Sequence, residues 1–231
     1  MIPGETALLA KRVRLVMELR RGGVSDARVL GIIEKTPRDL FIDPVFWDQA
    51  YENVALPIDN GQTVSQPLIV GQMTELLELG EREKVLEIGT GSGYHTAILA
   101  RLVRRVFTIE RHRDLLRAAE RRFEQLNLRN IITRFADGSK GWPEQAPFDR
   151  ILITAACPEL PNALLKQLAP GGVLVGPIGE AYREQRLVRI RRVEDGLESE
   201  DHGPVRFVPL VTGLPRPLES EARAVDGSVV E

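Results

Sequence analysis

Cysteine is nearly absent from this 231-residue chain, which contains only Cys157. A single thiol cannot form a disulfide within the chain, and it excludes a zinc site built from several cysteines. The three histidines, His95, His112 and His202, have no carboxylate or cysteine partners at ligand spacing, so we expect no metal. Because disulfide frameworks belong to oxidising compartments, the composition favours a reducing one, and we expect the protein in the cytoplasm.

An excess of either charge is also missing, since 31 Lys and Arg residues stand against 33 Asp and Glu residues. Proteins with a large nucleic-acid footprint are usually strongly basic, so we expect no nucleic-acid partner. Long apolar runs are lacking too: arginines interrupt the run from Ala97 to Val106, well short of the roughly 18 to 20 residues of a membrane span. The N-terminus has no apolar stretch behind a basic start, so neither a signal peptide nor a membrane partner is predicted.

Residues 1–60 predict a helical arm. From Glu5 to Arg21 apolar residues recur at helical spacing, and Gly22-Gly23 ends the pattern as a left-handed C-cap would. A second helix is predicted from a cap at Ser25-Asp26 to about residue 36, because Pro37 disfavours helical geometry in the residue before it. The mixed segment that follows predicts an irregular continuation, packed on the core.

From residue 61 the hydrophobic period switches repeatedly between that of a helix and that of a strand. Strands separated by helices of this length form right-handed crossovers and a mostly parallel sheet with helices on both faces. We therefore predict a doubly wound, Rossmann-like α/β domain over residues 61–214, followed by a frayed polar tail over residues 215–231. The predicted strands are 84–88, 106–110, 131–135, 149–154 and 172–175, with an antiparallel edge from 185–193 and 206–210. The predicted helices are 68–79, 94–104, 113–126 and 162–168.

The strongest local signal is Val85-Leu86-Glu87-Ile88-Gly89-Thr90-Gly91-Ser92-Gly93-Tyr94, a buried strand that enters a glycine-rich turn and then a helix. Such a turn brings a ligand against bare backbone, as in dinucleotide-binding folds. Glu110 lies 21 residues after Gly89 at the end of the next strand, where an acidic side chain binds a ribose diol. Both features predict a cofactor that contains adenosine.

Glu87 distinguishes between cofactors of this kind. Its carboxylate, two residues before the first glycine, would repel the pyrophosphate of NAD or FAD in a partly desolvated cleft. S-adenosylmethionine presents an ammonium and a sulfonium instead, and a carboxylate attracts both. The glycines also follow G-x-G-x-G rather than the G-x-G-x-x-G spacing of dinucleotide sites. The predicted cofactor is S-adenosylmethionine, with S-adenosylhomocysteine as its product; the alternative is a tight turn that binds no ligand.

Asp137-Gly138 follows the third strand at the same edge of the sheet. Asp137 is a candidate acceptor for the adenine amine, and the alternative is an Asx turn before Gly138. His95 is expected at the start of a helix, lining or bordering the cofactor loop. The predicted cofactor-binding residues are Glu87, Gly89, Thr90, Gly91, Ser92, Gly93, Glu110, Asp137 and Gly138.

A further set of motifs is spread from about Val29 to Leu210. It comprises Pro37-Arg38-Asp39-Leu40-Phe41, Ala50-Tyr51, Leu56-Pro57-Ile58, Gly61-Gln62-Thr63-Val64-Ser65-Gln66-Pro67, residues 85–100, Asp137-Gly138, Pro147-Phe148-Asp149, Leu168-Ala169-Pro170-Gly171-Gly172 and Arg206-Phe207-Val208-Pro209-Leu210. On these motifs the chain resembles the protein-L-isoaspartate O-methyltransferase family. The segment from Gly61 to Pro67 is the most specific of them, whereas the glycine loop alone would indicate only a methyltransferase.

The resemblance implies a Rossmann-like methyltransferase fold and a repair reaction. In that reaction a methyl group passes from S-adenosylmethionine to the free α-carboxylate of L-isoaspartyl residues. The implied partners are isoaspartyl-containing peptides and unfolded protein segments. Ser65 is implied as the catalytic residue that contacts this carboxylate, although from the residues alone it is equally a helix N-cap. The implied substrate-binding residues are Thr63, Val64, Ser65, Gln66, Arg206, Val208 and Pro209.

Other functions of the same fold stay open at this point. One is methylation of a small molecule, and another is recognition of carboxylates without catalysis. A nucleic-acid amino-methyltransferase would need a polar tetrad of the N/D-P-P-Y/F kind at the end of the fourth strand. This chain has Thr154-Ala155-Ala156-Cys157-Pro158 there, which disfavours that function.

Overall fold

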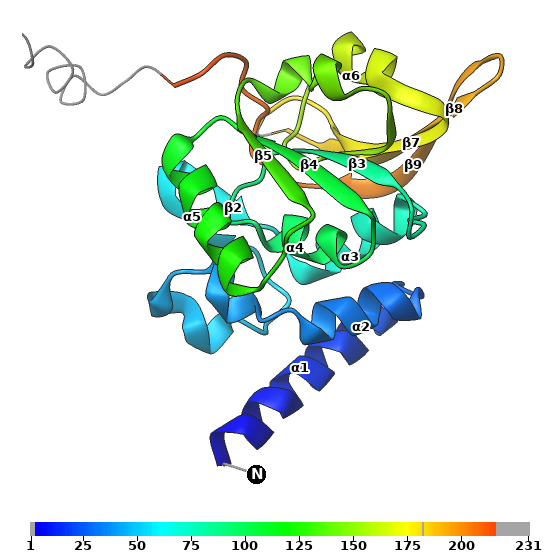
Figure 1. Ribbon diagram of the computed structural model, residues 1–231. Helices are drawn as coiled ribbons and strands as arrows, with labels where there is room; N and C mark the ends of the chain where they lie inside the picture. The colour runs from blue at the N-terminus through cyan, green and yellow to red at the C-terminus, as the bar shows by residue number, and fades with distance from the viewer. Residues whose placement is uncertain (1–2, 182, 216–231) are drawn as a thin grey trace, which may run out of the picture.

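A seven-stranded sheet forms the centre of the computed structural model, which describes residues 3–181 and 183–215 (Figure 1). The first five strands in spatial order pair in parallel, and the last two add antiparallel. The predicted doubly wound, mostly parallel sheet is therefore confirmed. The spatial order is β5 (Ile131–Phe135), β4 (Arg105–Glu110), β3 (Lys84–Ile88), β6 (Phe148–Ile153), β7 (Leu168–Ile178), β8 (Gln185–Val193) and β9 (Gly196–Val205).

Strand β3 lies where the chain reverses its direction across the sheet. From β3 the chain adds β4 and β5 on one side, and then crosses to add β6 and β7 on the other. Open α/β sheets bind ligands outside the carboxyl ends of their strands at such a point. The glycine loop that follows β3 therefore stands at the mouth of the expected crevice.

Helices cover both faces of the sheet, as predicted. On one face, Val85 of β3 and Val106 of β4 share a hydrophobic cluster with residues of α3 (Pro67–Leu76), α4 (Tyr94–Ala100) and α5 (Arg113–Gln125). On the other face, Leu86 and Phe107 pack in a second cluster with Leu164 of α6 (Asn162–Gln167). Alternate residues of each strand thus enter different layers of the core. Two short 3-10 turns, η4 (Gly138–Lys140) and η5 (Pro143–Gln145), lie between β5 and β6.

The N-terminal arm begins with α1 (Pro3–Arg21) and α2 (Ala27–Lys35), which extend below the sheet in Figure 1. The Asp26 carboxylate caps α2 by accepting hydrogen bonds from the backbone N–H groups of Arg28 (2.7 Å) and Val29 (3.3 Å). Buried arm residues such as Leu19 and Phe41 belong to the same cluster as α3 and α4, so one apolar interior joins the arm to the core. The arm continues as η1 (Arg38–Phe41), η2 (Pro44–Gln49), β1 (Leu56–Pro57), η3 (Asp59–Gly61) and β2 (Thr63–Val64), and β1 and β2 pair antiparallel.

Arg38 is a charged side chain with no exposed surface. Its guanidinium donates hydrogen bonds to the carbonyl oxygens of Ala50 (2.9 Å), Val54 (2.8 Å) and Ser65 (3.3 Å). It also lies 5.7 Å from the centre of the Tyr94 ring, at the start of α4. Arg38 therefore connects the arm, the segment that carries Ser65 and the helix that follows the glycine loop.

The edge of the sheet differs from the prediction. The edge strand is β9, whereas residues 206–210 form no strand of the sheet and make only one isolated bridge, between Pro209 and Ala156. Pro209 has no N–H to donate to a ladder. The side chain of Gln185 instead bonds both backbone groups of Phe207. The sequence does not reveal β9, because its residues are mostly exposed and show no apolar alternation.

The predicted tail lies outside the described residues, apart from Pro215. Within residues 3–181 and 183–215, no helix combines the length and the apolar character that crossing a bilayer requires.

Replacing Arg38 with alanine is expected to lower the free energy of unfolding by about 3 kcal/mol, because the carbonyl oxygens of Ala50, Val54 and Ser65 lose their donor at up to about 1–3 kcal/mol each. Urea unfolding followed by circular dichroism measures this loss. The control is Arg186→Ala, which removes a side chain that is 42% exposed and pairs with acidic groups at the sheet edge. Such surface pairs contribute about 0–1 kcal/mol. Equal losses in the two variants would contradict the role given to Arg38.

Candidate active site

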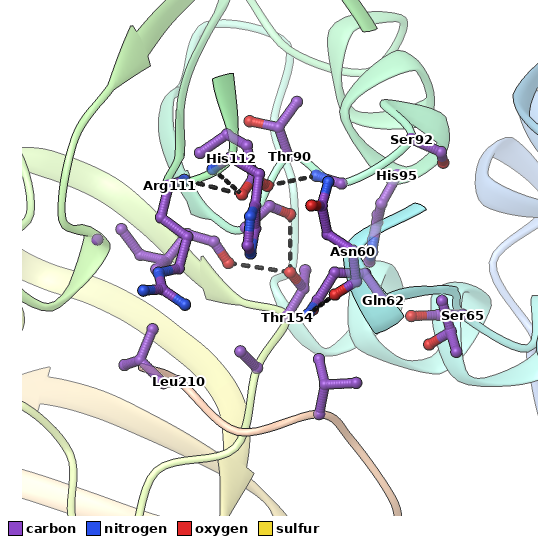
Figure 2. Close-up of a pocket in the computed structure, with 18 of the residues that line it drawn as sticks. Asn60, Gln62, Ser65, Thr90, Ser92, His95, Arg111, His112, Thr154 and Leu210 are labelled. Atoms are coloured by element: carbon purple, nitrogen blue, oxygen red, sulfur yellow. Dashed lines mark hydrogen bonds between the residues drawn. The ribbon is translucent and has the colours of Figure 1, made fainter. Parts of the chain in front are cut away.

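A cavity of about 410 Å³ opens at the carboxyl ends of β3, β4 and β6. Its size is typical of small-molecule sites, which range over roughly 300–1,000 Å³. Figure 2 shows side chains from distant parts of the chain converging on it. The lining residues are 60–65, 70, 88–92, 94–95, 109–112, 138, 154–155 and 208–211.

The glycine loop adopts a backbone that only glycine fits. Gly89 has a φ of +96°, and a Cβ placed there would lie 2.4 Å from Oγ1 of Thr154. Gly93 has a φ of +89°, and its Cβ would lie 2.7 Å from the Phe123 ring. Both positions therefore combine left-handed geometry with crowding. The loop presents bare backbone to the cavity, as the sequence motif predicts.

Glu110 holds the loop in place from the end of β4. Its carboxylate accepts hydrogen bonds from the backbone N–H groups of Gly91 (2.8 Å), Arg111 (2.8 Å) and His112 (2.9 Å). A carboxylate offers about four acceptor positions, so capacity for a ligand hydroxyl remains. Glu110 lines the cavity, which agrees with the acidic position that binds a ribose in related folds.

Glu87 does not line the cavity, contrary to the prediction that its carboxylate faces the cofactor. Side chains alternate along β3, so Ile88 reaches the cavity while Glu87 points under α4 with no exposed surface. Its Oε2 accepts hydroxyl hydrogen bonds from Thr96 (2.5 Å) and Thr108 (2.7 Å). The Oε1 atom has no partner among residues 3–181 and 183–215.

The surroundings of Glu87 make it a weak acid and connect it to the loop. Burial raises the pKa of this carboxyl to about 7; the two threonine hydroxyls oppose the shift and the charge of Glu110 adds to it. The Thr108 hydroxyl has one proton and donates it to Glu87, so it accepts from the Thr90 hydroxyl at 2.7 Å. Glu87 thus supports the glycine loop from beneath.

Asp137 forms the Asx turn that the sequence leaves as the alternative. Its Oδ1 accepts from the backbone N–H of Ser139 (3.0 Å) and from the Ser139 hydroxyl (2.7 Å). Its Oδ2 accepts from the N–H of Gly213 at 2.8 Å. Gly138 lines the cavity and Asp137 does not, because these bonds hold the carboxylate within its own turn and against the chain near residue 213.

A second cavity, of about 730 Å³, adjoins the first. Three residues line both cavities: Thr63, Ser65 and Val208. Of the residues that line the second cavity, Arg206 is the charged one. The full lining is Ala55, Thr63, Ser65, Gln66, Ile69 and residues 204–208.

Ser65 lies between β2 and α3, where the two cavities meet. The alternative, that its side chain caps the helix, does not hold, because α3 begins at Pro67 with Gln66 at the N-cap position and no side-chain cap. The backbone N–H of Leu68, in the first turn, donates instead to the side-chain oxygen of Asn53 at 2.9 Å. The Ser65 carbonyl is bonded to Arg38, and its hydroxyl has no partner among the described residues. The hydroxyl is therefore available to a ligand.

The structure brings most of the predicted site residues together. All seven predicted substrate-binding residues line one cavity or the other. Of the predicted cofactor-binding residues, Gly89, Thr90, Gly91, Ser92, Glu110 and Gly138 line the first cavity, whereas Glu87, Gly93 and Asp137 do not. Sequence reasoning missed Arg111 and His112, although their position directly after β4 was an available signal.

Comparison with known proteins points to one enzyme family. A family model described as protein-L-isoaspartate(D-aspartate) O-methyltransferase matches residues 10–214. The protein-L-isoaspartate O-methyltransferase of Rhodospirillum centenum is 62% identical over 203 residues, which cover 87% of this chain and 92% of that protein. The corresponding protein of Rhodospirillum rubrum is 60% identical over 208 residues, with coverage of 89% and 95%.

Solved structures agree with this similarity. A protein-L-isoaspartate O-methyltransferase superposes with a TM-score of 0.78 at 28% identity, over 92% of this chain and 69% of that chain. A Plasmodium falciparum protein assigned to the same class, in complex with S-adenosyl-L-homocysteine, superposes with a TM-score of 0.75 at 25% identity. That match covers 87% of this chain and 98% of the other.

The raised pKa of Glu87 predicts a pH-dependent stability. Between the ordinary pKa of 4.5 and about 7, the folded chain holds a proton that the unfolded chain has lost, so stability falls as pH rises. The Glu87→Gln variant lacks this titration. Its unfolding free energy relative to the native chain is expected to increase by roughly 2 kcal/mol between about pH 5 and pH 8.

Urea unfolding at several pH values, without added cofactor, measures this difference. The control is Glu124→Gln, at an exposed position of α5. Parallel curves for the native chain and Glu87→Gln would contradict the raised pKa.

Proposed function

The chain belongs to the protein-L-isoaspartate(D-aspartate) O-methyltransferase family, and we propose that Ser65 orients the methyl acceptor where its two cavities meet. The reaction transfers a methyl group from S-adenosylmethionine to the free α-carboxylate of an L-isoaspartyl residue in a damaged protein. The observation that carries the placement is that Ser65 lines both cavities. The first cavity then holds the cofactor, and the second holds the peptide that carries the acceptor.

The acceptor needs no general base. When bound, S-adenosylmethionine supplies a methyl group on a positively charged sulfur. A carboxyl group with a pKa of roughly 3.5 to 4 is already ionised at neutral pH. The work of the site is then to align the carboxylate and exclude water. The Ser65 hydroxyl would donate to one carboxylate oxygen and leave the other free to accept the methyl group.

The first cavity fits the cofactor in both chemistry and shape. The crowded glycines allow a ligand to approach the backbone of Gly89, Thr90, Gly91 and Ser92, and Glu110 has acceptor capacity for the ribose hydroxyls. Gly138 lines the cavity after β5, where it would lie near the adenine. Glu87 would act from beneath the loop, through Thr108 and Thr90, rather than by contact with the cofactor.

The wall of the second cavity suits an extended peptide. Gln185 holds Phe207, the N–H of Ala156 donates to the Val208 carbonyl (2.8 Å), and the N–H of Leu210 donates to the Ala156 carbonyl (2.7 Å). The segment 206–210 is thereby a fixed surface that requires no partner strand. An isoaspartyl residue within a folded protein would have to leave that fold to reach it, so we infer that unfolded segments are the preferred substrates.

We also propose that neither a metal nor a nucleic acid takes part. Residues 3–181 and 183–215 contain no group of three His, Cys, Asp or Glu side chains arranged to hold a metal ion. The acceptor chemistry requires no Lewis acid, since both reacting groups are already charged. We propose the cytoplasm as the compartment, which the single, buried cysteine supports.

The first test is methyl transfer from labelled S-adenosylmethionine to two matched synthetic peptides, one isoaspartyl and one normal aspartyl. Base-labile label is expected on the isoaspartyl peptide alone, because the extra backbone methylene presents a free α-carboxylate. Label on neither peptide, with the cofactor shown to bind, would favour a small-molecule acceptor or a module that only recognises carboxylates. Equal methylation of an isoaspartyl site locked in a rigid fold would contradict the preference for unfolded segments.

The Ser65→Ala variant is expected to lower turnover by about ten- to a hundredfold, the range for one hydrogen bond to a charged group. Affinity for S-adenosylhomocysteine, measured by calorimetry, should stay within about twofold of the native value. Ser199→Ala, at an exposed position of β9, is the control for turnover. An equal loss of cofactor affinity in Ser65→Ala would overturn the assignment.

A further inference from the structure

His95 is a buried histidine that the methyl-transfer step does not use. It lies in the first turn of α4, lines the first cavity with Ser65 and Val70, and has only 7% of its surface exposed. In Figure 2 its ring stands between Asn60 and Ser65. The Nε2 atom is 2.9 Å from the Thr74 hydroxyl.

The neighbouring hydrogen bonds determine which ring nitrogen carries the proton. The Thr74 hydroxyl is 2.7 Å from the Val70 carbonyl oxygen, and it has a single proton to donate. If Nε2 were an unprotonated acceptor, that proton could serve only one of two buried acceptors. With the proton on Nε2, the ring donates to Thr74 and Thr74 donates to Val70, so every group is satisfied.

The other ring nitrogen, Nδ1, is therefore an acceptor with its lone pair free. It has no partner among the described residues. The buried side-chain atoms without partners there are Arg38 Nε, Glu87 Oε1 and Arg189 Nε, so Nδ1 is not enclosed and opens to the cavity. Burial lowers the pKa of the ring to about 3, so it is neutral at physiological pH.

The position of His95 in the cavity indicates which part of the cofactor it can contact. Glu110 and Gly138 mark the ribose and adenine end of the cavity, whereas His95 bonds Thr74 of α3, the helix that follows Ser65, where the methyl group would be transferred. The methionyl part of the cofactor continues from the sulfur that carries this methyl group, and it ends in an ammonium. Glu110 is the one acidic residue in the lining, and Glu87 is enclosed beneath the loop. Among the neutral acceptors of the lining, the ring of His95 is fixed by its bond to Thr74 and has a nitrogen lone pair free to meet an N–H donor at this end.

We propose that Nδ1 of His95 accepts a hydrogen bond from the α-ammonium of the cofactor's methionyl group. His95 would then be a cofactor-binding residue that recognises the amino-acid end of the ligand. The inference rests on the cofactor site of the proposed function. Thr74 acts as a positioning residue, because its hydroxyl holds the proton of the ring on Nε2.

Calorimetry with two ligands tests the proposal without catalysis. S-adenosylhomocysteine contains the ammonium, whereas 5′-methylthioadenosine lacks the whole amino-acid end. His95→Leu is expected to weaken S-adenosylhomocysteine by about ten- to a hundredfold and to leave 5′-methylthioadenosine unchanged. His95→Gln should restore most of the affinity, because its amide can donate to Thr74 and accept from the ligand.

Three results would overturn the inference. His95→Leu could weaken both ligands equally, which would show general damage to the cavity, or it could weaken neither. His95→Gln could bind S-adenosylhomocysteine as poorly as His95→Leu, which would assign the effect to ring packing. If the native chain bound neither ligand, the proposed cofactor site itself would be wrong. If the native chain bound both ligands and methylated the isoaspartyl peptide, the proposed function would stand, and any of these three results would count against the role of His95 alone.

Nitrogen-15 NMR gives an independent readout, since the chain has three histidines and His95→Gln identifies the signals of His95. The expected spectrum shows a proton on Nε2, an unprotonated Nδ1 and no titration of this ring down to about pH 5. S-adenosylhomocysteine should shift the Nδ1 signal, and 5′-methylthioadenosine should not. A proton on Nδ1 in the free protein would overturn the proposal.

Discussion

The buried guanidinium of Arg38 is the interaction on which the arrangement of the active site depends. Hydrophobic burial joins the arm to the core, but apolar contacts are not directional. Arg38 adds direction, because each hydrogen bond that its terminal nitrogens donate requires an oxygen at a defined distance and angle. Its partners are carbonyl oxygens of the arm and of Ser65, and its face meets the ring of Tyr94. A charge without water around it is costly unless such partners are present, so the loss of any one of them destabilises the buried guanidinium.

Two acidic side chains of neighbouring strands stabilise the cofactor loop in different ways. Glu110 bonds the loop backbone directly and borders the cavity. Glu87 lies on the opposite side of the loop and reaches it through two threonine hydroxyls. The alternation of side chains along β3 explains the difference, since residues one position apart enter different layers. The loop is thus held on one side by a carboxylate that lines the cavity and on the other by a carboxylate with no exposed surface.

Much of the fold was predictable because its signals are local. β3, β5 and β8 have the predicted bounds. The glycines of the loop indicate a backbone with positive φ, and the structure has this backbone at Gly89, Gly91 and Gly93. The edge strand β9 was not predictable, because a strand exposed on both faces has no apolar pattern. The positions of Glu87 and Asp137 were also out of reach. Their sequence spacing fits a cofactor contact, but the layer that a side chain enters and the N–H groups that meet it depend on distant residues such as Thr96 and Gly213.

The exposed strand β9 has a consequence for the behaviour of the protein in solution. A sheet edge offers unpaired backbone groups to any extended chain, and an enzyme with the proposed preference for unfolded segments would meet such chains in every encounter. β9 carries Glu198, Glu200 and Asp201, and it ends beside Pro204. Arg189 and Arg186 hold two of these carboxylates at the edge through ion pairs. Charge and proline oppose the addition of a further strand, so the outer edge resists becoming a template for aggregation.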